Sequence, residues 1–120
     1  MIRAITLLTF IIATGVTIKA QEGLPKEYIG EWHNNMRHGN GTCTYWNKDV
    51  YEGEWKDNFW HGSGKLTYRN GDVYKGEFRL SNITGNGTFT YKNGDIYKGH
   101  FFGGNYQGNG ELTYKNGDKY

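Results

Sequence analysis

The sequence contains little cysteine, little proline and no large excess of charge of one sign. Its 120 residues include one Cys, one Pro, 14 basic residues and 12 acidic residues. A single cysteine cannot form an internal disulfide, which excludes a fold stabilised by disulfides within the chain. Beyond the first 20 residues, the apolar spacing of an amphipathic helix is also missing, which argues against a helical fold.

Glycine and aromatic side chains are abundant instead. There are 19 glycines, and aromatic residues make up 17% of the chain. The glycines do not recur at every third position, so a collagen helix is excluded. Aromatic and charged residues alternate over long stretches, a pattern that favours β-strands connected by turns.

The N-terminal segment differs from the rest of the chain. Arg3 gives a positive start, residues 4–18 are uncharged and largely apolar, and Ala20 is a small residue suited to a cleavage site. We predict a helical signal peptide over 1–20 and a short linker over 21–27, so that the mature chain is secreted, periplasmic or held at the cell surface. The uncharged run is short for a bilayer core, which takes about 20 helical residues. An uncleaved membrane anchor and an internal structural segment are the alternatives.

The charge balance bears on the partner. Removal of the signal peptide would take away Arg3 and Lys19, leaving 12 basic residues to match 12 acidic ones. Nucleic-acid binding relies on clustered, uncompensated Lys and Arg, so nucleic acid is not an expected partner. Cys43 is expected to be buried as a small apolar residue, and a disulfide to another chain is the alternative.

A strict repeat of 23 residues begins at Tyr28. It aligns the tyrosines at 28, 51, 74, 97 and 120 without insertion or deletion, and it divides the chain into blocks 28–50, 51–73, 74–96 and 97–119, with Tyr120 opening a fifth. A fixed period of this length indicates stacked supersecondary units.

Within each block the residue period is two, which is typical of β-strands. In the second block, Tyr51, Gly53 and Trp55 alternate with charged residues, so one face is aromatic and the other charged. We predict a first strand here, a loop over 57–61, and a second strand that completes a hairpin. Gly64 and Leu66 lie on the aromatic side of that second strand.

Asn-Gly pairs connect successive hairpins. Asn70-Gly71 recurs at 93–94 and 116–117 and predicts a tight type I′ turn, so that every strand is antiparallel to the one before it. Lys48 replaces the glycine in the first block. Because a positive φ is costly for lysine, we expect that turn to be strained or differently shaped.

The repeat motif resembles a known family. Tyr-x-Gly-Glu-Trp, then His-Gly-x-Gly, then Asn-Gly-Asp is similar to the MORN repeat (membrane occupation and recognition nexus), over Tyr28 to Tyr120. The last two blocks depart from the motif at Phe78, Thr84, His100, Phe101 and Gln107. The resemblance implies an all-β fold: a single-layer, twisted antiparallel β-meander of hairpins. It also implies a scaffold role in protein contacts, membrane apposition or self-association, with no catalytic centre.

A single layer cannot hide all of its aromatic surface, so we predict an open aromatic groove that takes a protein partner or a second copy. The groove residues would be Tyr28, Trp32, Tyr51, Trp55, Tyr74, Phe78, Tyr97 and Phe101, lined by Tyr45, Tyr68, Tyr91 and Tyr114. The strand near residues 111–114 would offer an edge for backbone pairing. The leading hypothesis is a non-enzymatic assembly or protein-interaction scaffold.

Two other functions remain open. A peripheral membrane module would gather lysines on one side of the sheet to bind phospholipid head groups. The lysines concerned are Lys75, Lys98, Lys115 and Lys119. A glycan-binding protein would use exposed Trp46, Trp60 and Tyr106 as stacking platforms.

The repeat spacing argues against catalysis. Equivalent residues of successive hairpins lie two strands, or about 10 Å, apart. His38 and His61 are such a pair, whereas the ligands of a metal ion lie about 2 Å from it. Ser63, close to His61 in sequence, is replaced by Asn in the other blocks. We therefore predict no metal site, no cofactor and no enzymatic activity.

Three N-glycosylation sequons begin at Asn40, Asn82 and Asn86. They would be used only if a eukaryotic cell exports the chain.

Overall fold

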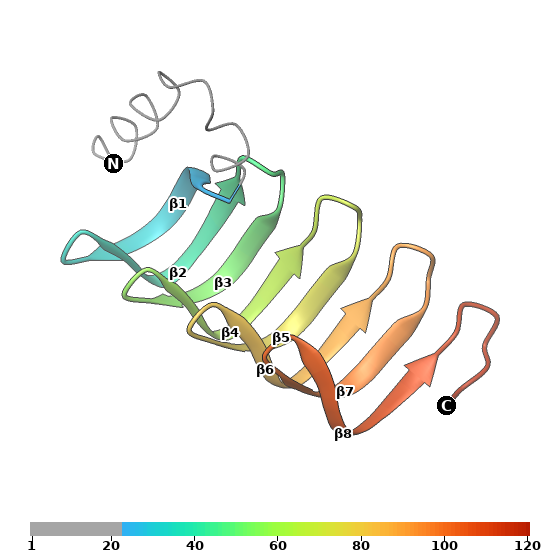
Figure 1. Ribbon diagram of the computed structural model, residues 1–120. Helices are drawn as coiled ribbons and strands as arrows, with labels where there is room; N and C mark the ends of the chain where they lie inside the picture. Colours follow the sequence, from blue (N-terminus) through green and yellow to red (C-terminus); the bar gives the residue numbers. More distant parts are fainter. Residues whose placement is uncertain (1–22) are drawn as a thin grey trace.

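The computed structural model describes residues 23–120, so the predicted signal peptide lies outside the described residues. Eight strands form one antiparallel sheet in chain order (Figure 1). They are β1 (Pro25–His33), β2 (Met36–Tyr45), β3 (Val50–Lys56), β4 (Phe59–Thr67), β5 (Val73–Arg79), β6 (Asn82–Thr90), β7 (Ile96–Phe102) and β8 (Asn105–Thr113). This confirms the predicted all-β meander of one hairpin per block. Strand β1 begins inside the segment 21–27 that the sequence suggests as a linker.

The two faces of the sheet differ as predicted. In β3, Tyr51 and Trp55 are buried, whereas Glu52 and Glu54 between them are exposed. Cys43 of β2 lies directly opposite Tyr51 and is fully buried, which confirms its predicted place in the core. The core is therefore built on one face of a single sheet.

The tightest turns are not where the Asn-Gly pairs predict them. Strands β3 and β4 are joined by only Asp57 and Asn58, both at positive φ (49° and 72°), as a type I′ turn requires. The predicted loop over 57–61 is therefore wrong, because β4 already begins at Phe59. The equivalent turns in the other blocks are Asn34-Asn35, Leu80-Ser81 and Gly103-Gly104.

The Asn-Gly pairs lie in longer connections. Five residues, Tyr68 to Asp72, separate β4 from β5, and the Gly71 amide donates to the Tyr68 carbonyl at 3.0 Å. Gly71 has a positive φ (100°) but Asn70 does not, so the type I′ prediction is wrong here. Instead, the Asn70 side chain accepts the Asp72 amide at 2.9 Å and fixes the turn.

Lys48 occupies the glycine position of the first such turn at a φ of 76°. Its amide donates to the Tyr45 carbonyl at 2.9 Å, and Tyr45 donates to Asp49 at 2.9 Å, the same bonds that Gly71 and Tyr68 make. The turn therefore keeps its shape, and the cost appears as backbone strain at Lys48.

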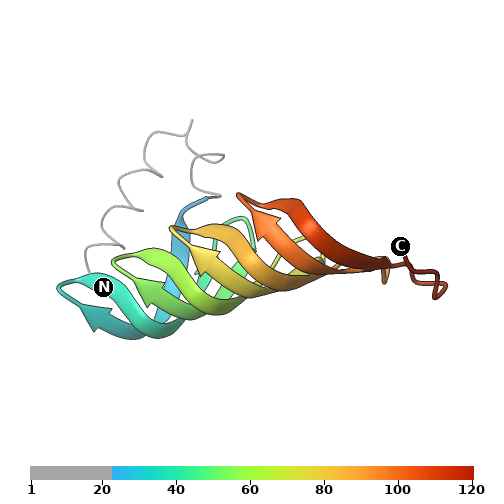
Figure 2. The ribbon, with the colours of Figure 1, turned by 90° about the horizontal axis from the view of Figure 1, so that it is seen from below.

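Each hairpin also contains a register shift. Gly53 pairs with Gly64 and Trp55 pairs with Trp60, so Glu54 faces a bulge in β4 that includes Gly62 at a φ of 61°. Bulges bend a strand and increase its twist. Figure 2 shows the result, a sheet that is curved and twisted rather than flat.

Candidate functional site

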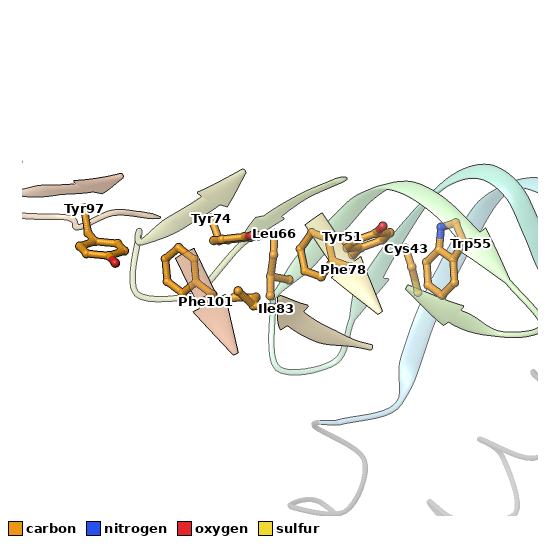
Figure 3. Packing of buried hydrophobic residues seen from close by; sticks show 9 residues of the cluster. All are labelled: Cys43, Tyr51, Trp55, Leu66, Tyr74, Phe78, Ile83, Tyr97 and Phe101. Atoms are coloured by element: carbon orange, nitrogen blue, oxygen red, sulfur yellow. The ribbon is translucent and has the colours of Figure 1, made fainter. Parts of the chain in front are cut away.

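The predicted aromatic groove is mostly buried. Six of its rings are between 0% and 7% exposed, namely Tyr51, Trp55, Tyr74, Phe78, Tyr97 and Phe101. Figure 3 shows these side chains in one line along the sheet, together with Cys43, Leu66 and Ile83. The six rings form the core, so the prediction that they line an open groove is wrong. Curvature of the sheet, which an alternating pattern does not encode, brings the rings into contact.

The rings connect one repeat to the next. Tyr51 meets Trp55 of its own block edge-to-face at 5.1 Å, and it meets Phe78 of the next block in the same way at 5.0 Å. Tyr74 repeats this geometry with Phe78 and Phe101, both at 5.1 Å. Such pairs contribute about 0.5–1.5 kcal/mol each beyond area burial. The row therefore holds neighbouring hairpins at a fixed spacing.

The tyrosine hydroxyls of the row donate hydrogen bonds to backbone carbonyls. Tyr51 donates to the Glu54 carbonyl at 2.7 Å, and Tyr74 donates to the Glu77 carbonyl at 3.1 Å. Burial raises the pKa of Tyr74 to about 12 and raises the pKa of Tyr51 further. Both side chains therefore remain neutral hydrogen-bond donors at physiological pH.

Carboxylates on the polar face accept hydrogen bonds from backbone amides in the bulges. Glu54 accepts the Ser63 amide at 2.7 Å, and Glu77 accepts the Asn86 amide at 2.6 Å. Glu31 makes the same bond to Asn40 at 2.6 Å. The repeated glutamates therefore have a structural role, which accounts for their recurrence without any catalytic use.

Aspartates in the long turns link successive blocks. Asp49 accepts the Arg69 amide of the next block at 2.8 Å, and Asp72 accepts the Lys92 amide at 2.8 Å. Asp95 bonds to Lys115 in the same way at 2.9 Å. One long edge of the sheet is thus a continuous chain of bonded turns.

A groove runs across the strands on the face opposite the aromatic row. Its larger part, about 850 Å³, spans β2 to β5, and a part of about 320 Å³ continues it to β7. The two parts share Lys75 and Gly76. Glycines form its floor, and Lys65, Lys75 and Lys98 are among the side chains along it. We call this the polar groove.

Comparison with protein-family models agrees with this geometry. The MORN repeat model matches residues 28–50, 51–73, 74–96 and 97–119, which are the four hairpin blocks. The chain belongs to the MORN repeat family. A comparison with curated proteins gave no match. MORN repeats commonly serve in protein or membrane interactions.

The tips of three MORN hairpins expose apolar side chains. Phe59, Leu80 and Phe102 lie in or next to the tight turns and are 45%, 59% and 67% exposed. We call this set the tip ridge. The repeat pattern does not predict the tip ridge, because Phe59 and Phe102 stand on opposite sides of the turn and share no column of the repeat.

Backbone bonds hold the tips at a fixed spacing. Ser81 donates to the Trp60 carbonyl at 3.1 Å, and Gly104 donates to the Ile83 carbonyl at 3.1 Å. Each of these bonds joins one hairpin tip to the preceding hairpin, so the tip ridge is part of the same rigid array.

The remaining rings of the predicted groove differ in exposure. Trp32 and Tyr114 are each 40% exposed. The other four, Tyr28, Tyr45, Tyr68 and Tyr91, are half-buried. Of the rings predicted to form the groove, Trp32 on β1 and Tyr114 beyond β8 are therefore the most accessible.

The proposed glycan platforms are largely occupied. Trp60 stacks on Tyr51 at 4.9 Å and donates its indole N–H to the Tyr45 hydroxyl at 2.8 Å. Trp46 is half-buried, with the Lys26 ammonium 5.1 Å from its ring. The predicted exposure of Trp60 and Trp46 is therefore wrong. Tyr106 is 46% exposed, but one face of its ring stacks on Tyr97 at 3.9 Å.

The four lysines of the membrane hypothesis do not gather in one place. Lys75 and Lys98 share the polar groove, whereas Lys115 lies in a turn against Gly94. The Lys119 ammonium is 3.8 Å from the Glu111 carboxylate. The structure thus places Lys75 and Lys98 in the same groove and Lys115 away from them.

The sequon asparagines Asn40, Asn82 and Asn86 are all exposed. The Asn82 amide donates to the Leu80 carbonyl at 3.2 Å. Asn40 and Asn86 lie at the polar groove, so a glycan at either position would extend from it.

The histidines do not form a metal site in the part of the chain that the structure describes. His38 faces Asp57, with Nδ1 and Oδ1 3.7 Å apart. Across residues 23–120, no three or more His, Cys, Asp or Glu side chains lie close enough to hold a metal ion. The same residues include no helix long and apolar enough to cross a bilayer.

Proposed function

We propose that the protein is a non-enzymatic MORN scaffold that assembles with protein partners, a second copy included, through the tip ridge. The observation that carries the proposal is the exposure of Phe59, Leu80 and Phe102 at successive hairpin tips. Exposed apolar side chains that gather along one edge of a protein mark interaction sites in soluble proteins. Successive hairpin tips are about 10 Å apart, so one partner can contact all three of them.

Light scattering on the full chain over a range of concentrations tests this proposal. The triple variant Phe59→Ser, Leu80→Asn, Phe102→Ser should lower the average mass at high concentration, because it removes the apolar contacts. Lys92→Gln, at the opposite edge of the sheet, is the matched control and should leave the mass unchanged. A monomer at every concentration in both the parent and the triple variant would refute self-assembly.

The outer edge of β8 is a second route of assembly in this proposal. In the described residues, this edge pairs with the last residues of the chain: Leu112 and Tyr120 exchange backbone bonds of 2.8 and 3.0 Å, and Thr113 bridges to Lys119. The rest of β8 is exposed. The predicted edge at residues 111–114 is therefore partly covered at Leu112 and Thr113. A Leu112→Pro substitution removes the amide that bonds Tyr120 and uncovers this edge, so a higher mass in light scattering would support edge pairing and an unchanged mass would contradict it.

Membrane binding is the alternative function, and one observation favours it. Lys56 and Arg79 lie next to the tip ridge and are exposed, so the tips combine apolar and basic side chains. Interfacial binding uses such a combination, with salt weakening only the electrostatic part. Flotation with phosphatidylserine vesicles at low and high salt separates the two functions. Salt-sensitive flotation lost in Lys56→Gln, Arg79→Gln would favour the membrane function.

Export is also part of the proposal. It is supported by the sequence of residues 1–20, with cleavage near Ala20. Mass spectrometry of the chain expressed with a secretion pathway should find a mature protein beginning near Gln21. Recovery of the intact chain in the membrane fraction would indicate the uncleaved anchor instead.

A further inference from the structure

We propose that the polar groove binds a short extended protein segment with acidic residues at three alternating positions. This inference rests on the proposed function as an interaction scaffold, but it uses a different face of the sheet from the tip ridge. It also names the chemistry of the ligand.

The register of the strands places three lysines in one row. Lys65 of β4 lies directly opposite Lys75 of β5, and Thr88 of β6 lies opposite both Lys75 and Lys98. All three lysines line the polar groove. At about 4.8 Å per strand, the backbone positions of Lys65 and Lys98 are about 14 Å apart.

The row keeps an excess of positive charge within the described residues: Glu52 lies opposite Lys65 and Glu111 lies opposite Lys98, whereas Lys75 has only Lys65 and Thr88 opposite it. The ion pairs there join His38 to Asp57 and Lys119 to Glu111, so neither includes a lysine of the row. Glu77 lines the same groove, but its carboxylate accepts the Asn86 amide at 2.6 Å. Like charges directly opposite each other destabilise a sheet. An anionic ligand would remove this cost.

The total length of the lysine row matches that of an extended peptide. Side chains at positions i, i+2 and i+4 of a strand lie on one face and span about 14 Å. The gaps differ, because Lys75 lies about 5 Å from Lys65 and about 10 Å from Lys98, whereas alternate residues of a strand are about 7 Å apart. The long, flexible lysine side chains bridge this difference of about 2–3 Å, so three alternating Asp or Glu residues can reach all three lysines. The groove volumes of about 850 and 320 Å³ lie within or near the size of ordinary ligand sites.

The ends of the row limit the length of the ligand. Glu52 lies opposite Lys65, and Glu111 lies opposite Lys98. A long uniform polyanion, such as nucleic acid or a sulfated polysaccharide, would meet a carboxylate at each end. The order of charges along the groove instead complements a short peptide that is acidic in its middle and basic or neutral at its two ends.

Fluorescence anisotropy tests the proposal with the full chain and a labelled nonapeptide. The peptide carries Glu at three alternating positions, Ser between them and Lys at both ends. Binding should weaken at least tenfold in Lys65→Gln, Lys75→Gln, Lys98→Gln, and it should weaken with salt. Lys92→Gln, a turn lysine, is the matched control and should bind as the parent does. A peptide with three consecutive Glu should bind less tightly than the alternating one.

Equal peptide binding by the parent and the triple lysine variant would overturn the proposal, and so would no binding at millimolar peptide in low salt. Tighter binding of a heparin fragment or of phosphatidylserine vesicles through the same three lysines would also overturn it. Circular dichroism shows whether the variant is folded, and removal of the Lys65–Lys75 repulsion should not lower its Tm. Light scattering of the tip-ridge variant reports on the scaffold function independently, so the two failures are distinguishable.

Discussion

The ring of Tyr51 lies across the backbone of Gly64, on the neighbouring strand. A Cβ atom at Gly64 would be 2.5 Å from the Tyr51 hydroxyl oxygen and 2.7 Å from two carbons of its ring. Tyr74 covers Gly87 in the same manner in the next block. The tyrosine and glycine columns of the repeat are therefore two halves of one packing contact.

This contact predicts that Gly64→Ala destabilises the protein. The ring is rigid and is held by the Glu54 carbonyl, so it cannot move away without losing that hydrogen bond. We expect the free energy of unfolding to fall by about 1–3 kcal/mol, which is typical of an overpacked core. Urea denaturation measures the change. Gly23→Ala is the control, since a Cβ there would meet nothing within 4 Å.

Lys48→Gly should stabilise the protein. Lys48 has a φ of 76°, where the equivalent Gly71 has 100°. Relief of the strain should raise the free energy of unfolding by about 0.5–1.5 kcal/mol, after the entropic cost of glycine is subtracted. The same substitution at Lys56, the last residue of β3, should lower it, because Lys56 does not have a positive φ and no strain is relieved there. A loss of stability in Lys48→Gly would show that the turn is not strained.

The negative charge of Glu54 should contribute more to the stability of the protein than that of Glu52 on the same strand. Glu54→Gln weakens the 2.7 Å bond to the Ser63 amide, and we expect a loss of about 0.5–1.5 kcal/mol in the free energy of unfolding. Glu52→Gln is the control on the same face of the same strand, and it should have a smaller effect. Thermal denaturation of both variants makes the comparison.

The fourth block lacks this glutamate, so adding it there should stabilise the protein. His100 stands where the other blocks have Glu, and a Cβ at Gly108, in the bulge it faces, would meet nothing within 4 Å. His100→Glu should supply the missing acceptor for the Asn109 amide and raise the Tm. An unchanged Tm, together with unchanged hydrogen exchange at Asn109, would contradict the structural role assigned to these glutamates.

Stability should decrease between about pH 10 and pH 12. Burial raises the pKa of Tyr74 to about 12 from an ordinary value of 10.0, so the folded protein binds this proton more tightly than the unfolded chain does. The stabilisation is fully present below pH 10 and is lost as the pH rises toward 12. Urea denaturation across this range measures the slope. Tyr74→Phe should make the slope shallower, whereas Tyr120→Phe, at 75% exposure, should not.

The sequence predicts the topology well, because period-two alternation and the 23-residue repeat are both direct consequences of strand pairing. Tyr51 and Trp55 share the buried face, and Cys43 lies opposite Tyr51, as the columns of the repeat imply. The turn types are less accessible. Leu80 and Ser81 are not residues that favour a positive φ, yet both adopt one, at the position that Asp57-Asn58 and Gly103-Gly104 occupy in the neighbouring hairpins.

The candidate site was harder to predict than the fold. Alternation places Tyr74 and Phe78 on one face but says nothing about curvature, which determines whether that face is open or buried. The lysine row depends on register: Lys65 and Lys75 are ten residues apart in sequence and meet only because β4 and β5 pair at those positions. The first strand of a block alone would not reveal this contact.

The link from Asp49 to the next turn means that length can vary only in whole units. Loss of residues 51–73 would join Val50 to Tyr74 and leave Asp49 facing the Lys92 turn, which is chemically equivalent to the one it lost. Loss of a single residue within β5 would instead turn every later ring of that strand outward. Related proteins should therefore differ from this one by whole blocks of 23 residues. Such changes would lengthen or shorten the sheet without altering the surface of each block.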